Sequence, residues 1–133
     1  MADLTLLSGN KQGRPQPTND VTLSVRAGAS VTVLQALHTA ADGDMILSDA
    51  SVAGTAIFDG LMLNNSASDG DAITIISRGP VYGFDLSSQD YGDVIYLSDT
   101  AGALADAAGT VSVPVGKVIK LNGEKVVWLG LTA

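Results

Sequence analysis

Residues 118–129 read VIKLNGEKVVWL, and this stretch predicts a β-hairpin. Two apolar runs, residues 118–121 and 125–129, flank Asn122, Gly123 and Glu124. Asn-Gly favours the type I′ turn, whose twist matches that of two antiparallel strands. The C-terminal part of the chain is therefore expected to be two paired strands.

Upstream of this hairpin, further strands are indicated by alternation and by turn residues. In residues 21–27 apolar and polar residues alternate, which places Val21, Leu23 and Val25 on one buried face. Gly-Asp then directly precedes an apolar run three times, within residues 42–46, 69–73 and 91–95. Glycine reaches the positive φ of a tight turn and Asp bonds nearby amides, so each Gly-Asp predicts a turn before a strand.

Some segments leave alternatives open. Residues 30–37 begin with strand-like alternation, but their second half fits a helical turn equally well. Residues 100–109 are rich in Ala and Gly and predict a loop with at most one turn. Residues 45–49 and 95–99 share the pattern Leu-Ser-Asp after two apolar or aromatic residues, but the irregular spacing of the three units excludes a solenoid.

The length and composition of the chain predict one all-β domain. The 133 residues (13.5 kDa) suffice for one compact core, and two domains would each be marginal. Hydrophobic residues make up 46% but aromatic residues only 5%, so the core is expected to be aliphatic. We predict an extended arm at residues 1–20 and a single domain at residues 21–133, with barrel and sandwich topologies both open.

The predicted arm is polar and turn-prone. Pro15 and Pro17 disfavour helix, and residues 2–18 could span about 55 Å if fully extended. One interpretation is a frayed terminus without a role, and the other is an arm that docks on a neighbouring molecule. The candidate partner-binding residues of the arm are Leu4, Leu6, Leu7, Lys11, Arg14, Pro15 and Pro17.

The charge distribution argues against nucleic acid as a partner. The net charge is −7, with +1 in residues 1–26, −10 in residues 27–116 and +2 in residues 117–133. Nucleic-acid binding depends on Lys and Arg, and an acidic body of this kind repels phosphates. The acidic body either keeps copies apart in solution or steers them towards a basic surface. The sequence has neither a signal-peptide pattern nor an apolar run long enough to span a bilayer, so we expect no membrane contact and synthesis in a cytoplasm.

Residues with catalytic chemistry are few. Absence of cysteine excludes disulfides, thiolate zinc sites and a cysteine nucleophile, and no Gly-x-Ser-x-Gly elbow occurs. His38 is the only histidine and would need an acid and a nucleophile beside it to act as a base. The pairs Asp42 with Asp44 and Asp69 with Asp71 could bind Ca²⁺, but aspartates of surface turns explain them as well. We therefore predict a non-enzymatic protein without catalytic residues, metal or cofactor.

Trp128 is the only tryptophan and lies on the last predicted strand. A tryptophan in this position either packs in the core or serves as an aromatic residue of an interface, where large aromatic side chains are enriched. Both interpretations remain open from the sequence.

Residues 60–76, 94–104, 109–111 and 114–119 together resemble the capsid decoration, or head cement, proteins of tailed bacteriophages. The resemblance covers residues 43–119, over half of the chain. It implies a β-barrel-like or β-tulip domain that assembles as homotrimers on the outer surface of an expanded phage head. There it would clamp neighbouring subunits of the major capsid protein, with the N-terminal arm lying across the capsid lattice.

Two other function classes compete with this expectation. A small all-β binding module, for carbohydrate or host-surface adhesion, could use exposed Asp and Asn side chains with Tyr82 and Trp128. A metal-assisted hydrolase could use the aspartate pairs.

Overall fold

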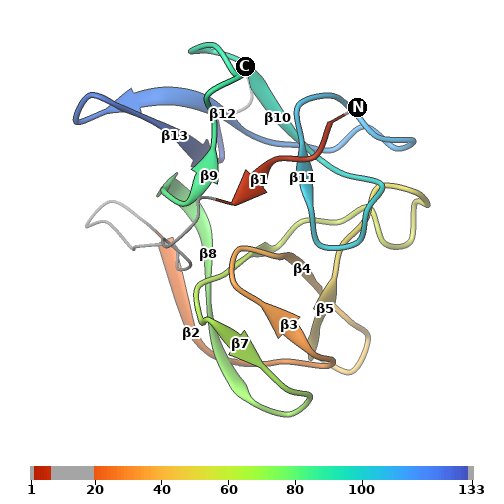
Figure 1. Ribbon diagram of the computed structural model, residues 1–133. Helices are drawn as coiled ribbons and strands as arrows, with labels where there is room; N and C mark the ends of the chain where they lie inside the picture. The colour runs from red at the N-terminus through yellow and green to blue at the C-terminus, as the bar shows by residue number, and fades with distance from the viewer. Residues whose placement is uncertain (1, 7–19, 132–133) are drawn as a thin grey trace.

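The computed structural model describes residues 2–6 and 20–131 of the chain (Figure 1). The all-β prediction is confirmed, since the described residues contain strands, turns and loops but no helix, and hence no helix able to cross a membrane. The strands are β1 (Thr5–Leu6), β2 (Asp20–Arg26), β3 (Val31–Thr32), β4 (Ala36–Thr39), β5 (Met45–Leu47), β6 (Gly60–Met62), β7 (Ser66–Ala67), β8 (Ala72–Val81), β9 (Phe84–Asp85), β10 (Val94–Leu97), β11 (Leu104–Ala105), β12 (Pro114–Leu121) and β13 (Glu124–Leu129).

One large sheet organises the domain and curls into a half-barrel (Figure 1). Its strands follow the order β11-β10-β12-β13-β8-β6-β4-β5, and β2 also pairs with β8. Strand β8 is the longest, with 10 residues, and joins the two halves of the sheet. Its first part pairs with β2 and β6, and its last part pairs with β13.

The curled sheet encloses two mainly aliphatic clusters, as the low aromatic content predicts, with Phe84 as an aromatic member of the larger one. The larger cluster lies among β8, β10, β12 and β13 and includes Ile76, Ile95 and Val127, all without exposed surface. The smaller cluster lies among β3, β4, β5, β6 and β8 and includes Leu37 and Met62. Burial of these side chains is the main favourable contribution to folding, roughly 1.5–3 kcal/mol for each fully buried aliphatic side chain.

The turns follow the local rules that the sequence indicates. Asn122 and Gly123 have φ values of 53° and 81° and join β12 to β13, as a type I′ turn requires. The glycines of the three Gly-Asp units, Gly43, Gly70 and Gly92, have φ values of 92°, 91° and 92°. Each precedes a strand, so the hairpin and all three predicted turns are confirmed.

Two ambiguous segments are resolved by the fold. Residues 30–37 form β3, a turn and the start of β4, and the helical alternative is wrong because Leu34 has a φ of 59° and turns the chain. Residues 100–109 form a loop as predicted, except that Leu104 and Ala105 pair with β10 as the edge strand β11. The predicted strand at residues 21–27 corresponds to β2; the side chains of Val21 and Leu23 lie outside the described part, and Val25 packs partly buried against the smaller cluster.

Candidate interaction surface

The first residues of the predicted arm lie against the domain of the same chain. Residues 2–4 run beside β11, and β1 pairs with β9. Leu4 is half-buried against the larger cluster, whereas Leu6 is 38% exposed. The other predicted partner-binding residues lie outside the described residues; they are Leu7, Lys11, Arg14, Pro15 and Pro17.

Trp128 lies on the face of β13 that points away from the larger cluster. Its cross-strand neighbours are Lys117 and Pro80, whereas the adjacent Val127 pairs with Val118 inside the cluster. Trp128 is half-buried and belongs to neither aliphatic cluster. Trp128 therefore does not pack in the core, which was one of the two interpretations that the sequence left open.

Two neighbouring loops, which we call the paired loops, form a surface feature held by many hydrogen bonds. The first loop comprises residues 48–59, between β5 and β6, and the second comprises residues 98–113, between β10 and β12. Both begin with the repeated Ser-Asp that ends the two similar sequence units. The two serines, Ser48 and Ser98, have no exposed surface.

Asp49 organises the first loop. Its Oδ1 atom accepts hydrogen bonds from the Ser51 amide (3.1 Å), the Ser51 hydroxyl and the Thr55 hydroxyl (3.0 Å). Its amide donates to the Thr55 carbonyl oxygen (3.1 Å), and the Thr55 amide donates to the Val52 carbonyl oxygen (3.2 Å). One carboxylate thus fixes the shape of the loop from residue 49 to residue 55.

Asp99 does the same for the second loop. Its two carboxylate oxygens accept from the amide and the hydroxyl of Thr110, each at 2.9 Å. Gly109 lies against this contact, and a Cβ atom there would be 2.6 Å from Asp99 Oδ1 and 2.8 Å from Ala50 Cβ. The second loop therefore closes tightly only with glycine at this position.

The paired loops are also bonded to each other. The Ala50 amide donates to the Ser98 carbonyl oxygen (2.8 Å), and the Gly102 amide donates to the Ser48 carbonyl oxygen (2.7 Å). The Val111 amide donates to the Ala50 carbonyl oxygen (2.8 Å). These bonds make the paired loops one preorganised surface rather than two independent loops.

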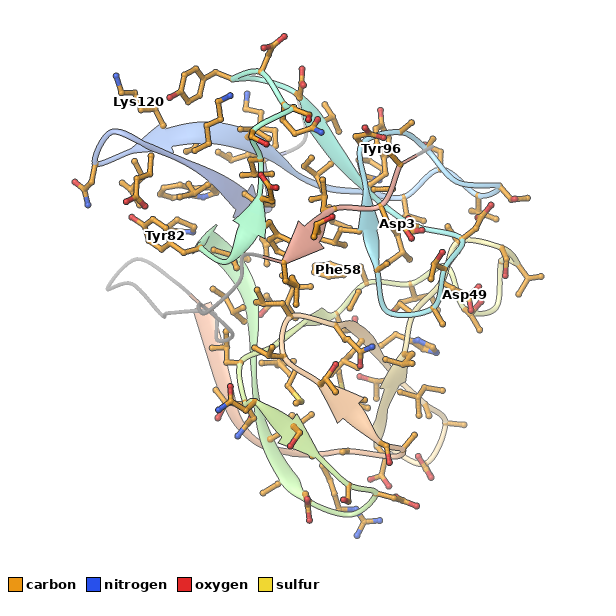
Figure 2. The ribbon with its side chains drawn as sticks, in the orientation of Figure 1. Asp3, Asp49, Phe58, Tyr82, Tyr96 and Lys120 are labelled. Carbon is orange, nitrogen blue, oxygen red and sulfur yellow. The ribbon has the colours of Figure 1, made fainter. Side chains whose placement is uncertain are left out.

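The outer surface of the paired loops consists mostly of small side chains, and two stretches of it are uncharged. Residues 50–58 and 107–116 contain no charged side chain, although the chain carries 21 charged residues. Val52 is 56% exposed and Ile57 is 47% exposed. Figure 2 shows the two loops together at one side of the molecule, with Asp49 beneath the first. The exposed residues of the loops within these stretches are Ser51, Val52, Ala53, Gly54, Ile57, Ala107, Ala108, Thr110 and Ser112, and the second loop also exposes Thr100, Ala101 and Asp106.

This arrangement is suited to contact with another protein. Protein interfaces are depleted in charged residues at their core, and small side chains permit close approach. Loops that are already fixed lose little conformational entropy on binding. The aspartates that fix the paired loops act as structural groups and not as charges for a partner.

The pKa of Asp49 is lowered from its ordinary value of 3.8, chiefly because the Ser51 hydroxyl donates to the carboxylate. A lowered pKa means that the ionised group stabilises the fold above pH 3.8 and that this contribution is lost as the pH falls through the lowered pKa. Because Asp49 is only partly buried and solvent screens its charge, D49N is expected to reduce the free energy of unfolding by only about 1 kcal/mol at pH 7. Urea unfolding at pH 7 and pH 2 should show the difference in unfolding free energy between D49N and the natural chain disappearing in acid. An equal difference in unfolding free energy between D49N and the natural chain at both pH values would contradict the role of the carboxylate charge.

Gly109 provides a test of the packing between the paired loops. G109A should lower the free energy of unfolding by about 1–3 kcal/mol because the added methyl group displaces Asp99 or Ala50. G54A is the matched control, since a Cβ at Gly54 meets nothing within 4 Å. Thermal unfolding of both variants measures the difference in stability. A G109A variant as stable as G54A would contradict the close contact of Gly109 with Asp99 and Ala50.

His38 supports the first loop from beneath. It is buried, and its Nδ1 atom lies 3.3 Å from the Ser48 hydroxyl, which donates to the Ile57 carbonyl oxygen. Because that hydroxyl proton is engaged with Ile57, His38 is the donor in its contact with Ser48. The pairing of β4 with β5 thus brings His38 and Ser48 together. Their hydrogen bonds hold the backbone of Ile57 in place.

The aspartate pairs serve in turns. Asp44 forms an ion pair with Arg26 (3.0 Å), and the Asp44 amide donates to Asp42 Oδ1. Asp71 Oδ2 accepts from the Ser68 amide (2.8 Å) across its turn. The described residues contain no group of three or more His, Cys, Asp or Glu side chains placed to hold a metal ion.

The paired loops were not predicted as a site, although the sequence carried a signal. The repeated Leu-Ser-Asp at residues 47–49 and 97–99 was interpreted only as a sign of similar strands. In this acidic chain an uncharged stretch, residues 50–58, follows the first repeat directly, and another, residues 107–116, begins a few residues after the second repeat. A Ser-Asp pair at the end of each strand, with an uncharged stretch in the loop after it, is the pattern that could have indicated them.

Comparison with known proteins identifies no relative. No family model, no curated protein and no solved structure matches the chain.

Proposed function

We propose that the chain is a structural decoration protein of a tailed-bacteriophage capsid. It binds the outer surface of the expanded head as a trimer and stabilises the contacts between neighbouring major capsid subunits. The observation that carries the proposal is the preorganised surface of the paired loops, in which residues 50–58 and 107–113 carry no charge, on an otherwise acidic domain. The residues that resemble head cement proteins include residues 94–104 and 109–111, which lie in and beside the second loop.

The size of the domain is compatible with this role. The described surface measures 6367 Å², and a standard protein interface takes about 800 Å² from each partner. One capsid contact and two contacts within a trimer would together use somewhat more than a third of this surface. Many such modest contacts on one shell act together through multivalency.

Co-sedimentation with phage heads tests the proposal. Purified protein should bind expanded, undecorated heads of the phage that encodes it, and should bind unexpanded heads at least tenfold more weakly. Binding through the uncharged stretches of the paired loops should change less than threefold between 0.05 and 0.5 M NaCl, because screening acts on charged contacts. Absence of binding to either form of the head would refute the proposal. A steep loss of binding with added salt would mean that the acidic surface, and not the paired loops, contacts the head.

The alternative of a carbohydrate-binding module has one observation in its favour. Trp128 pairs with Pro80 near the end of β8, and Tyr82 follows directly after this strand, two residues beyond Pro80. Figure 2 shows Tyr82 beside β13. Quenching of Trp128 fluorescence by glycans, together with failure to bind heads, would favour this function.

A further inference from the structure

Residues 2–4 lie against the second of the paired loops. The Leu4 amide donates to the Leu104 carbonyl oxygen (2.9 Å). Ala2 and Asp106 are joined twice, since the Asp106 amide donates to the Ala2 carbonyl oxygen (3.1 Å) and the Ala2 backbone nitrogen donates to Asp106 Oδ1 (3.0 Å). Figure 1 shows the segment running past β11. These bonds fix residues 2–4 beside β11 within the same chain.

The side chain of Asp3 reaches the residue that begins the second loop. Asp3 Oδ1 accepts the hydroxyl proton of Ser98, which has no exposed surface. Figure 2 shows Asp3 beside β11. The Ser98 hydroxyl oxygen also accepts from the Thr100 amide (3.0 Å), and the Ser98 carbonyl oxygen accepts from the Ala50 amide (2.8 Å). Ser98 is thus the residue at which the N-terminal segment, the second loop and the first loop are joined.

The second loop obtains from Asp3 what the first loop obtains within itself. Ser48, which begins the first loop, donates its hydroxyl proton to the Ile57 carbonyl oxygen of the same loop. Ser98 donates to Asp3, which lies 95 positions away in the chain. A serine hydroxyl has one proton to donate, and a buried hydroxyl without an acceptor is unfavourable. Removal of the Asp3 carboxylate is therefore expected to disturb the backbone around Ser98.

We propose that Asp3 is a positioning residue for the paired loops and acts through Ser98. By accepting the Ser98 hydroxyl proton, Asp3 holds the start of the second loop in the shape that bonds to Ala50, and so keeps both loops in one arrangement. Loops that are already fixed lose less conformational entropy when they bind. In its effect on head binding the inference rests on the proposed function, whereas its effect on the loops is measured in the free chain.

Amide hydrogen exchange of the free chain, resolved by NMR, tests this role. In D3A the amides of Thr100 and Ala50 should exchange about tenfold faster, because local opening of the loops then costs less free energy. The Leu63 amide donates to the Thr74 carbonyl oxygen (2.9 Å), away from the paired loops, and should exchange as in the natural chain. D3N should keep exchange at Thr100 and Ala50 within about threefold of the natural chain, because its amide oxygen can accept the same proton.

Two further variants serve as controls. D85A removes the same charge from β9 beside residue 5, where the Asp85 carboxylate accepts from the Ser87 amide (3.1 Å), and should leave exchange at Ala50 unchanged. The double variant D3A/S98A shows whether Asp3 acts through Ser98. In the S98A background, the addition of D3A should change exchange at Ala50 by less than about twofold, because the two substitutions remove the same hydrogen bond.

Binding of the same variants to expanded heads completes the test. D3A should bind about tenfold more weakly than the natural chain, and D3N within about threefold of it. Natural exchange rates in D3A, equal acceleration in D3A and D3N, or a full effect of D3A in the S98A background would each overturn the inference. Unaltered head binding by D3A with faster loop exchange would overturn the link to the partner. If the natural chain does not bind heads, the proposed function fails, and the exchange rates still decide the role of Asp3 in the loops.

Discussion

V52D is expected to weaken binding to expanded heads by roughly 100-fold, a loss of about 2.7 kcal/mol. Val52 is 56% exposed at the tip of the first loop, where every neighbouring residue from 50 to 58 is uncharged. A carboxylate buried there on binding would find no partner among the residues of the loop, and burying an unpaired charge costs several kcal/mol. The isotherm from co-sedimentation measures the effect directly.

The matched control for V52D is N65D, which adds the same charge on the exposed Asn65 outside the paired loops. N65D should bind heads within twofold of the natural chain. Both variants should keep their free energy of unfolding within about 0.5 kcal/mol, since surface substitutions of this kind rarely do more. Equal loss of binding in both variants would mean that net charge, and not the paired loops, governs the contact.

G116A is expected to have the largest effect on stability. Gly116 is buried on β12 opposite Leu129, and a Cβ there would lie near the Trp128 carbonyl oxygen, at 3.0 Å from the Trp128 carbonyl carbon and at 3.1 Å from Leu129 Cα. All three atoms belong to the backbone, so β12 and β13 must separate and weaken their hydrogen bonds. A loss of about 3 kcal/mol, at the upper end of the range for added methyl groups, is a large part of a total of roughly 5–15 kcal/mol.

Thermal unfolding measures this prediction, with a decrease in Tm of about 10 °C expected for a domain of this size. G54A again serves as the control, because its added methyl group points into open space. A G116A variant that melts with the natural chain would contradict the register between β12 and β13, and with it the position of Trp128 on the outer face.

Local rules predicted the parts of the fold that depend on neighbours in the chain. Asn122 and Gly123 defined the last hairpin, and glycines with positive φ began β5, β8 and β10 as expected. The edge strand β11 was missed because its pairing with β10 and with residues 2–4 gives order to an Ala-rich stretch that has no strand pattern of its own. The turn at Leu34 was missed because a non-glycine residue there has a positive φ, held by tertiary contacts.

The candidate surface depends on contacts that sequence patterns do not specify. The bonds from Ala50 to Ser98 and from Gly102 to Ser48 join residues about fifty positions apart. The roles of Asp49 and Asp99 follow from the course of the loops around them, which a Leu-Ser-Asp repeat alone does not give. By contrast, the lack of charge in residues 50–58 and 107–116 is a property of the sequence and needed only the fold to bring the two stretches together.

The most direct test of the central claim is oxidative footprinting of the chain in solution and on expanded heads. Hydroxyl radicals modify exposed aliphatic side chains, and Val52 and Ile57 are among the most exposed of these. The account predicts strong protection of Val52 and Ile57 on the head, with Tyr91, which lies away from the paired loops and is 52% exposed, modified as before. Unchanged modification of Val52 and Ile57 on saturated heads would contradict the claim that the paired loops form the capsid contact.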